Sequence, residues 1–182
     1  AGVDYAKLQK RNPDVCVPES QKNKPKSTPW GDMTYLQYKH KIEFNEDQIK
    51  ELIQFGKDIG IKVFASVWDI DSAELMARHT GIAKIGSACI TDLELCKRTR
   101  ELFDFVIIST GMSTEEEIEK CVEVCNPDVI MHTNSSYPSK TDELNLRYIE
   151  WLKNKWSGRE IGYSGHEYGL VTTFAAVTLG ST

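Results

Sequence analysis

Short apolar, β-rich runs alternate with stretches of helical periodicity along the whole chain, and this alternation restricts the possible folds more than any other feature. Two of the runs, Phe105–Thr110 and Asp128–Thr133, are apolar at nearly every position, as strands buried on both faces of a parallel sheet require. The six strands that we predict are Val3–Gln9, Ile61–Val67, Ile82–Gly86, Phe105–Thr110, Asp128–Thr133 and Ile161–Ser164. The pattern therefore predicts an α/β fold with a parallel sheet.

Short polar side chains precede the helical stretches, and their oxygens can accept hydrogen bonds from the first N–H groups of a helix. The expected helix starts are Asn45, Asp71 or Ser72, Thr91, Ser113 and Thr141. In contrast, the polar segment from Lys10 to about Met33 contains four prolines, which we expect to prevent regular helix. We predict a long loop there, which either covers a binding site or is a solvated linker.

Periodicity alone does not distinguish an open doubly wound sheet from a closed barrel. A barrel draws functional side chains from the ends of many strands, whereas an open sheet concentrates them at one switch point. Here nearly every predicted strand ends in polar, reactive residues, which lie in its last positions or just after it: Lys7 and Gln9, Ser66 and Asp69, Lys84 and Ser87, Ser109–Gly111, Asn134–Tyr137 and Ser164–Glu167. This distribution favours a (β/α)8 TIM barrel, of which about six βα units out of eight are present in this chain.

Charge and composition exclude several classes of partner. Lys and Arg total 22 against 27 Asp and Glu, so no global basic field exists to hold nucleic acid or an anionic membrane. The longest apolar runs are shorter than the ~20 residues that a membrane helix needs. Five cysteines, an odd number, without a signal peptide favour free thiols in a reducing compartment, so we predict a cytoplasmic protein.

Two lysines, Lys7 and Lys84, lie at the ends of apolar strands, where a charge is best explained by an anionic ligand. The alternative is an ordinary lysine that reaches water. Serine and glycine gather in neighbouring turns, and such turns suit a phosphate or carboxylate because glycine allows close approach and serine donates a hydrogen bond. Ser and Gly are also the usual residues of βα loops, so each turn alone is weak support.

The histidines and cysteines are less specific. His166 ends a strand beside Glu167, where an imidazole can bind a divalent metal, move a proton, or simply be buried and hydrogen-bonded. His132 lies in an apolar strand and is expected in the core or directly behind the site residues, and we expect His40 and His79 at the surface. Cys121 and Cys125 are expected to be structural, since no second cluster completes a zinc site. Walker and dinucleotide-binding glycine motifs are absent from the sequence.

Six strings in order resemble the sialic acid synthase family, whose members are (β/α) barrels. The strings are Ala6–Gln9, Thr28–Tyr35, Ala83–Ser87, Ile108–Ser113, Ser135–Pro138 and Gly162–His166. Members of this family condense phosphoenolpyruvate with an N-acetylated mannose-type aldose, release phosphate and form a nonulosonic acid such as N-acetylneuraminate. The resemblance thus implies a C–C bond-forming transferase of carbohydrate biosynthesis. It leaves open whether the acid is sialic, legionaminic or pseudaminic, and whether the aldose is free or a 6-phosphate.

The resemblance also implies roles for individual residues, with Lys7, Lys84 and His166 as the catalytic set. Lys7 and Lys84 would bind phosphoenolpyruvate, and His166 would be one of two histidines that hold Mn²⁺ or Mg²⁺. Gln9 and Tyr137 would face the sugar. The residues that would hydrogen-bond the phosphate and carboxylate of phosphoenolpyruvate are Ser87, Ser109, Ser135 and Ser164.

By the same resemblance, residues 1–182 are a partial TIM-barrel catalytic domain. The family's first and last strands and its C-terminal antifreeze-like domain would lie outside this chain, and the full-length protein would be a homodimer. We expect residues 1–182 alone to be aggregation-prone or molten, to bind the divalent metal weakly and to be inactive, because two strand edges would be unpaired. The alternatives are another phosphoenolpyruvate-condensing or Schiff-base aldolase barrel, with Lys84 as nucleophile, or a non-catalytic anion-binding barrel.

Overall fold

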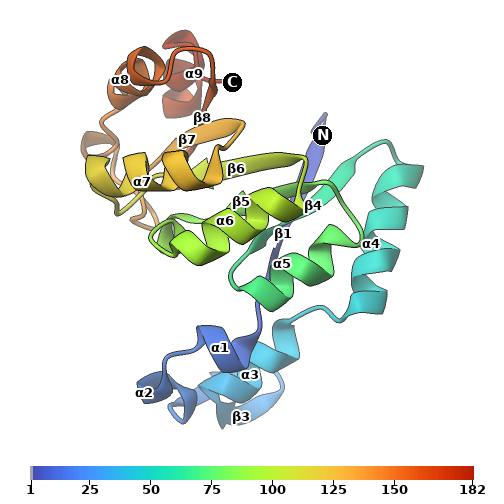
Figure 1. Ribbon diagram of the computed structural model, residues 1–182. Helices are drawn as coiled ribbons and strands as arrows, with labels where there is room; N and C mark the ends of the chain where they lie inside the picture. The colour runs from blue at the N-terminus through green and yellow to red at the C-terminus, as the bar shows by residue number, and fades with distance from the viewer. Residues whose placement is uncertain (1) are drawn as a thin grey trace. The chain divides into compact units, whose positions relative to one another are not determined.

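The computed structural model describes residues 2–182, which form two compact units, one up to Thr80 and one from Gly81 onward (Figure 1). Two parallel strands lie in the first unit and four in the second, each within one to two residues of a predicted strand. The α/β prediction with parallel strands is therefore confirmed. A closed eight-unit barrel is not seen among the described residues, whose parallel strands number six.

In the first unit, β1 and β4 pair in parallel, with Lys7 beside Phe64 and Gln9 beside Ser66. Helix α4 packs closely on β4 at Gly56, where a Cβ atom would lie 2.5 Å from Cγ2 of Val63. The elements of this unit are β1 (Tyr5–Lys10), α1 (Pro13–Cys16), α2 (Glu19–Lys22), β2 (Pro25–Thr28), β3 (Gly31–Thr34), α3 (Tyr35–Ile42), α4 (Glu46–Asp58), β4 (Lys62–Val67) and α5 (Ile70–Ala77).

The segment expected to be a loop is folded, so that prediction was wrong. It contains α1, α2 and an antiparallel hairpin, β2–β3, that leads into α3 (Figure 1). Pro13 does not block α1, because it occupies the first turn, where its missing N–H would have no helical partner. The side chain of Asn12 caps this helix by accepting a hydrogen bond from the backbone N–H of Asp14 (3.2 Å).

In the second unit, β5, β6, β7 and β8 pair in parallel in chain order. The core residues Ile85, Ile108 and Ile130 are fully buried and lie in register on the sheet face that the helices cover. The elements are β5 (Ile82–Ile85), α6 (Leu93–Leu102), β6 (Phe105–Ser109), α7 (Glu115–Cys125), β7 (Val129–Thr133), α8 (Tyr148–Lys155), β8 (Glu160–Ser164) and α9 (Val171–Thr178), with short 3-10 turns at Ser87–Cys89 and Thr141–Glu143.

The expected helix starts are only partly correct. Asn45 caps α4 as expected, in a reciprocal arrangement with Gln48. Three other helices are capped by residues adjacent or close to the expected ones, namely Asp69, Asp92 and Thr114. Each of these side chains accepts a hydrogen bond from the backbone N–H of the residue three positions later. Thr141 begins only a 3-10 turn, and α8 begins later, at Tyr148.

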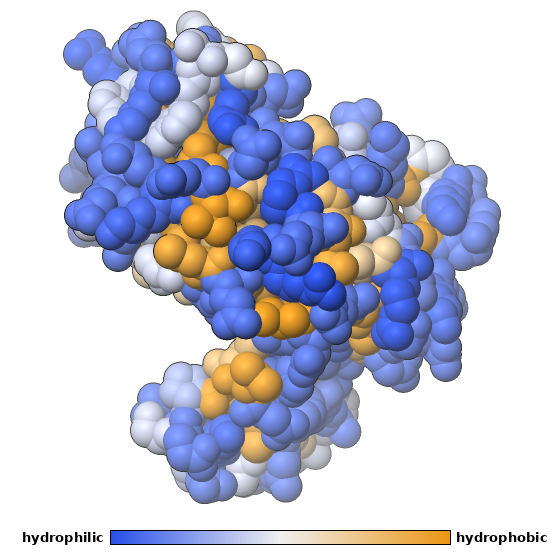
Figure 2. Space-filling view, viewed as in Figure 1, coloured by the Kyte–Doolittle hydropathy of each residue, from blue (hydrophilic) through white to orange (hydrophobic). Residues whose placement is uncertain are grey.

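The face of the molecule drawn in Figure 2 is predominantly polar. Hydrophilic side chains cover most of the face shown in Figure 2, and apolar ones appear in separate patches. Within residues 2–182, no helix combines the length and the apolar character needed to cross a membrane.

Candidate functional site

In the second unit, the strand register sets polar side chains on one face of the sheet. Residues in register on parallel strands point to the same side, and successive residues point to opposite sides. Ile85, Ile108 and Ile130 take the helix-covered face, so their neighbours along the strands take the other. The polar residues of that other face, opposite the helices, are Lys84, Ser109, Thr133 and Ser164 toward the carboxyl ends of the strands, and Glu160 at the start of β8. Three of these, Lys84, Ser109 and Ser164, are predicted site residues.

Lys84 and Ser109 are both removed from water. Lys84 is 8% exposed and Ser109 is 2% exposed. Among the described residues, the Ser109 hydroxyl finds no hydrogen-bond partner although it is buried. A buried polar atom without a hydrogen-bond partner costs on the order of 1–3 kcal/mol of stability. Such an atom is therefore expected where a ligand or water molecule supplies the missing hydrogen bond. A ligand with acceptor oxygens would supply that partner.

Three strand ends converge at Gly111, which follows β6. Its backbone N–H donates to the Ser87 hydroxyl (3.0 Å), and a Cβ atom at this position would collide with the hydroxyl of Ser135 and lie 3.1 Å from the carbonyl oxygen of Thr133. The hydroxyls that follow β5 and β7 therefore gather around a glycine that leaves room for them. Beside them is a cavity of about 430 Å³ lined by Met112, Thr133, Asn134, Ser135 and Ser136.

The loop after β7 is held by Asn134 and presents Tyr137. The Asn134 amide oxygen accepts hydrogen bonds from the backbone N–H of Ser136 (2.8 Å) and the hydroxyl of Ser139 (3.2 Å). Tyr137 is 85% exposed, and its ring meets the His166 ring edge to face, with centroids 5.3 Å apart. The structure thus brings together Tyr137, which the family resemblance assigns to the sugar, and His166, which it assigns to the metal.

His166 has one ring nitrogen available for a ligand. Its Nδ1 atom is buried and has no hydrogen-bond partner within the described part of the chain. The neighbouring Glu167 instead accepts hydrogen bonds from the Tyr163 hydroxyl (3.0 Å) and from Thr172. Partial burial raises the pKa of Glu167, but these hydrogen bonds outweigh it and the net pKa is lowered. An unpartnered imidazole nitrogen fits one metal ligand, whereas residues 2–182 contain no cluster of three or more metal-binding side chains.

The other histidines occupy structural positions. His132 is buried with its Nε2 atom 2.7 Å from the carbonyl oxygen of Leu144, which confirms it as a core residue. His40 is half exposed, as expected, and lies 3.2 Å from Asp14. The expectation for His79 was wrong: Glu46 covers it, with 2.9 Å between the Nε2 and Oε1 atoms, and only 13% of the side chain is exposed.

Cys121 and Cys125 of α7 belong to the core, as predicted, and Cys96 of α6 packs with them. The sulfur atoms of Cys96 and Cys121 are 3.6 Å apart, and both residues are fully buried together with Cys125. Hydrogen bonds with Cys125 and Cys96, together with burial, raise the pKa of the Cys121 thiol. This thiol remains protonated, as a structural cysteine does.

In the first unit, Lys7 and Gln9 share one face of β1, because they are two residues apart on a strand. Both are exposed. Nearby protein atoms displace water from the Lys7 ammonium and lower the pKa of Lys7. The amide oxygen of Gln9 accepts a hydrogen bond from the guanidinium of Arg11 (2.8 Å).

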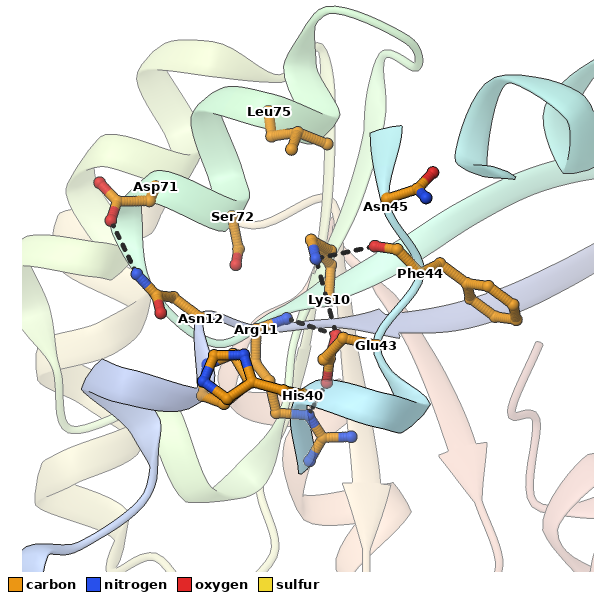
Figure 3. Close-up of a pocket in the computed structure, with 11 residues that line it drawn as sticks. Lys10, Arg11, Asn12, His40, Glu43, Phe44, Asn45, Asp71, Ser72 and Leu75 are labelled. Atoms are coloured by element: carbon orange, nitrogen blue, oxygen red, sulfur yellow. Dashed lines mark hydrogen bonds and ion pairs between the residues drawn. The ribbon is translucent and has the colours of Figure 1, made fainter. Parts of the chain in front are cut away.

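A charged pocket of about 350 Å³ follows the end of β1 (Figure 3). Glu43 forms ion pairs with both Arg11 and Lys10, and Lys10 also donates to the carbonyl oxygen of Phe44 (3.0 Å). Across the pocket, the side chain of Asn12 donates to Asp71 (3.3 Å). Arg11 and Glu43 were not among the residues predicted from the sequence. The only signal was the basic pair directly after Gln9.

A buried lysine and converging hydroxyls at the carboxyl ends of parallel strands are typical of α/β proteins that bind an anionic ligand there. The chain matches the NeuB family over residues 1–182 and belongs to that family. The family resemblance predicted from the six motifs is confirmed.

Named relatives differ in their products. The chain is 35% identical to the N-acetylneuraminate-9-phosphate synthase of Drosophila melanogaster over 158 residues, covering 84% of this chain and 42% of that protein. It is 30% identical to the N,N'-diacetyllegionaminic acid synthase of Campylobacter jejuni over 191 residues, covering 100% of this chain and 57% of that protein. The chain thus spans about half the length of these relatives.

The fold is similar to that of a solved relative. The N-acetylneuraminic acid synthetase of Leptospira borgpetersenii superposes with a TM-score of 0.86 at 25% sequence identity, covering 98% of this chain and 60% of that protein.

Proposed function

We propose that this chain is part of the catalytic domain of a nonulosonic acid synthase, which condenses phosphoenolpyruvate with an N-acetylated aldose and releases phosphate. Membership of the NeuB family supports the reaction class. The observation that carries the proposal is the buried Lys84 on the same sheet face as the unpartnered Ser109 hydroxyl. A cation and a spare hydroxyl on one face suit the phosphate or carboxylate of phosphoenolpyruvate.

The residues divide between the two substrates. Lys84 and Lys7 would neutralise phosphoenolpyruvate, and four hydroxyls would donate to its oxygens. The hydroxyls are those of Ser87, Ser109, Ser135 and Ser164. Gln9 and Tyr137 would orient the open-chain sugar so that its aldehyde carbon faces the enol carbon.

The reaction forms a C–C bond and a C–O bond to water, and it breaks the C–O bond to phosphate. The two protons of the water end on the former aldehyde oxygen and on the departing phosphate. The enol carbon attacks the aldehyde carbon, water adds at the resulting oxocarbenium centre, and the tetrahedral intermediate collapses with loss of phosphate. Fixed positive charge from Lys84 and Lys7 stabilises the charge on the departing phosphate. His166 would supply one ligand to Mn²⁺ or Mg²⁺, which when bound polarises the aldehyde as a Lewis acid.

The sugar acceptor is the finer part of the proposal. Relatives named for different nonulosonic acids match at 35% and 30% identity, so a panel is needed: N-acetylmannosamine, its 6-phosphate and a bacillosamine-derived sugar. The full-length protein with Mn²⁺ and phosphoenolpyruvate should release phosphate and form a nine-carbon keto acid from one of them. If it consumes none, the proposed function is wrong. A homodimeric, cytoplasmic full-length protein remains a prediction.

Burial of Lys84 also suits a nucleophilic amine, which is the alternative function. Borohydride would then trap a substrate adduct on Lys84. Phosphate release without trapping would exclude a Schiff base. If neither occurs but phosphoenolpyruvate still binds in a calorimetric titration, the domain is a non-catalytic anion-binding protein.

A further inference from the structure

Three contacts of the Arg11 side chain fix its guanidinium, and a backbone hydrogen bond of the same residue supports them. Its Nε atom pairs with Glu43, whose side chain is only 8% exposed, and its backbone N–H donates to the same carboxylate (3.3 Å; Figure 3). The guanidinium lies over the ring of Trp68, 5.3 Å from the ring centroid. Its NH2 group donates to the amide oxygen of Gln9 (2.8 Å).

Glu43 is itself held from the other side. Lys10 lies 3.7 Å from the second carboxylate oxygen and donates to the carbonyl oxygen of Phe44, the next residue. The carboxylate is therefore fixed between Lys10 and Arg11. A planar guanidinium that is paired on one edge and stacked on an aromatic ring has little freedom to turn.

This arrangement determines which end of the Gln9 amide points outward. A glutamine amide has one acceptor oxygen and one amino group with two donors, whereas a guanidinium has donors only. Arg11 can therefore pair with the oxygen alone. The amino group of Gln9, on an exposed side chain, is left to donate to an atom outside the chain.

We propose that Arg11 is a positioning residue, which holds Gln9 so that its amino group donates to an acceptor oxygen of the sugar. This rests on the proposed function, in which Gln9 faces the sugar. Gln9 then recognises a carbonyl or hydroxyl oxygen, such as the acetamido carbonyl, rather than a donor group.

A double-mutant cycle tests this role in the full-length protein, with KM measured for the sugar and for phosphoenolpyruvate. We expect Arg11→Met and Gln9→Ala each to raise the sugar KM about tenfold, while the double variant is no worse than Gln9→Ala alone. The KM for phosphoenolpyruvate should stay the same. Additive effects, or equal losses for both substrates, would show that Arg11 is merely structural. Arg78→Met is the matched control, since Arg78 is exposed and pairs with Glu46 (3.3 Å).

Gln9→Glu separates the contact with Arg11 from the contact with the sugar. The carboxylate of the Gln9→Glu variant still accepts a hydrogen bond from Arg11 but has no N–H to donate to the sugar. The sugar KM should therefore rise as much as in Gln9→Ala, although the variant is no less stable than the wild type. A wild-type sugar KM in Gln9→Glu would overturn the proposal.

If the wild-type protein converts no aldose, the proposed function fails, and the positioning contact is tested separately. The side-chain amide NMR signals of Gln9, assigned by their loss in Gln9→Ala, should shift in Arg11→Met and stay in place in Arg78→Met. Unshifted signals in Arg11→Met would overturn the positioning role whatever the activity.

Discussion

The polar sheet face of the second unit, which carries Lys84 and Ser109, and the charged pocket after β1 in the first unit differ in how their polar atoms are satisfied. On the sheet of the second unit, the Ser109 hydroxyl is buried without a partner within the described residues. In the first unit, Glu43 is bonded to Lys10 and Arg11. A ligand site keeps polar groups whose hydrogen bonds only the ligand completes, whereas in a supporting network the polar groups bond to one another. Substitutions in the two regions should therefore have opposite consequences for binding and for stability.

The largest effect is expected at His166. His166→Ala should abolish metal-dependent activity of the full-length protein and change its thermal unfolding little, because the Nδ1 atom bonds to no described residue and the ring contact is with Tyr137, which is itself 85% exposed. Activity assays across a Mn²⁺ titration measure this. If the variant keeps its Mn²⁺ dependence, His166 is not a ligand.

Lys84→Ala should weaken phosphoenolpyruvate binding by about 1.5–3 kcal/mol, because it removes a charge-assisted contact. Isothermal titration calorimetry gives the change. Lys50 is the control, since it lies on the outer face of α4 with about half of its side chain exposed, and Lys50→Ala should leave the affinity unchanged. Equal effects of the two substitutions would refute a binding role for Lys84.

Glu43→Gln should show the opposite pattern. Two cations lose their shared carboxylate, so we expect the free energy of unfolding to fall by about 1–3 kcal/mol while phosphoenolpyruvate affinity is retained. Urea unfolding measures the loss. Glu116→Gln, at an exposed pair with Lys120, should change stability little. Stability equal to that of the wild type in Glu43→Gln would remove the contrast between the two regions.

Gly111→Ala should reduce phosphoenolpyruvate affinity by about 1–2 kcal/mol, because the added methyl group displaces the Ser135 hydroxyl. Gly86→Ala is a matched control, since a Cβ atom there has no neighbour within 4 Å among the described residues. Calorimetric titrations of both variants decide the point. A similar loss in Gly86→Ala would mean that crowding of the serines is not the cause.

The smallest effect concerns pH. Loss of hydration lowers the pKa of Lys7 below its ordinary value of 10.5, so its ammonium is charged below that lowered pKa and neutral above it. Phosphoenolpyruvate affinity should therefore weaken as the pH rises through the lowered pKa. Lys7→Arg, which stays charged, should flatten this dependence in titrations from neutral to alkaline pH. An unchanged profile would exclude Lys7 from the anion site.

The strand positions and the polar strand ends were predictable from the sequence, because burial on both faces leaves an apolar run such as Phe105–Ser109. Helix starts were predicted less well. Thr91 and Asp92 are both chemically suitable caps, and only the backbone conformation selects Asp92. The same holds for Pro13, because proline breaks a helix in its interior but is well accommodated in the first turn, where Pro13 lies.

The contacts that make a site were decided by tertiary structure alone. Arg11 and Glu43 are 32 residues apart, and Gly111 and Ser87 are 24 apart. The hydrophobic periodicity of the sequence does not predict such contacts, because each contact depends on which strand ends and connecting segments the fold brings together. The sequence by itself determined the family, the parallel strands and the residue types at their ends. Which hydroxyl is left without a partner, and which amide end of Gln9 faces outward, depended on neighbours distant in the chain.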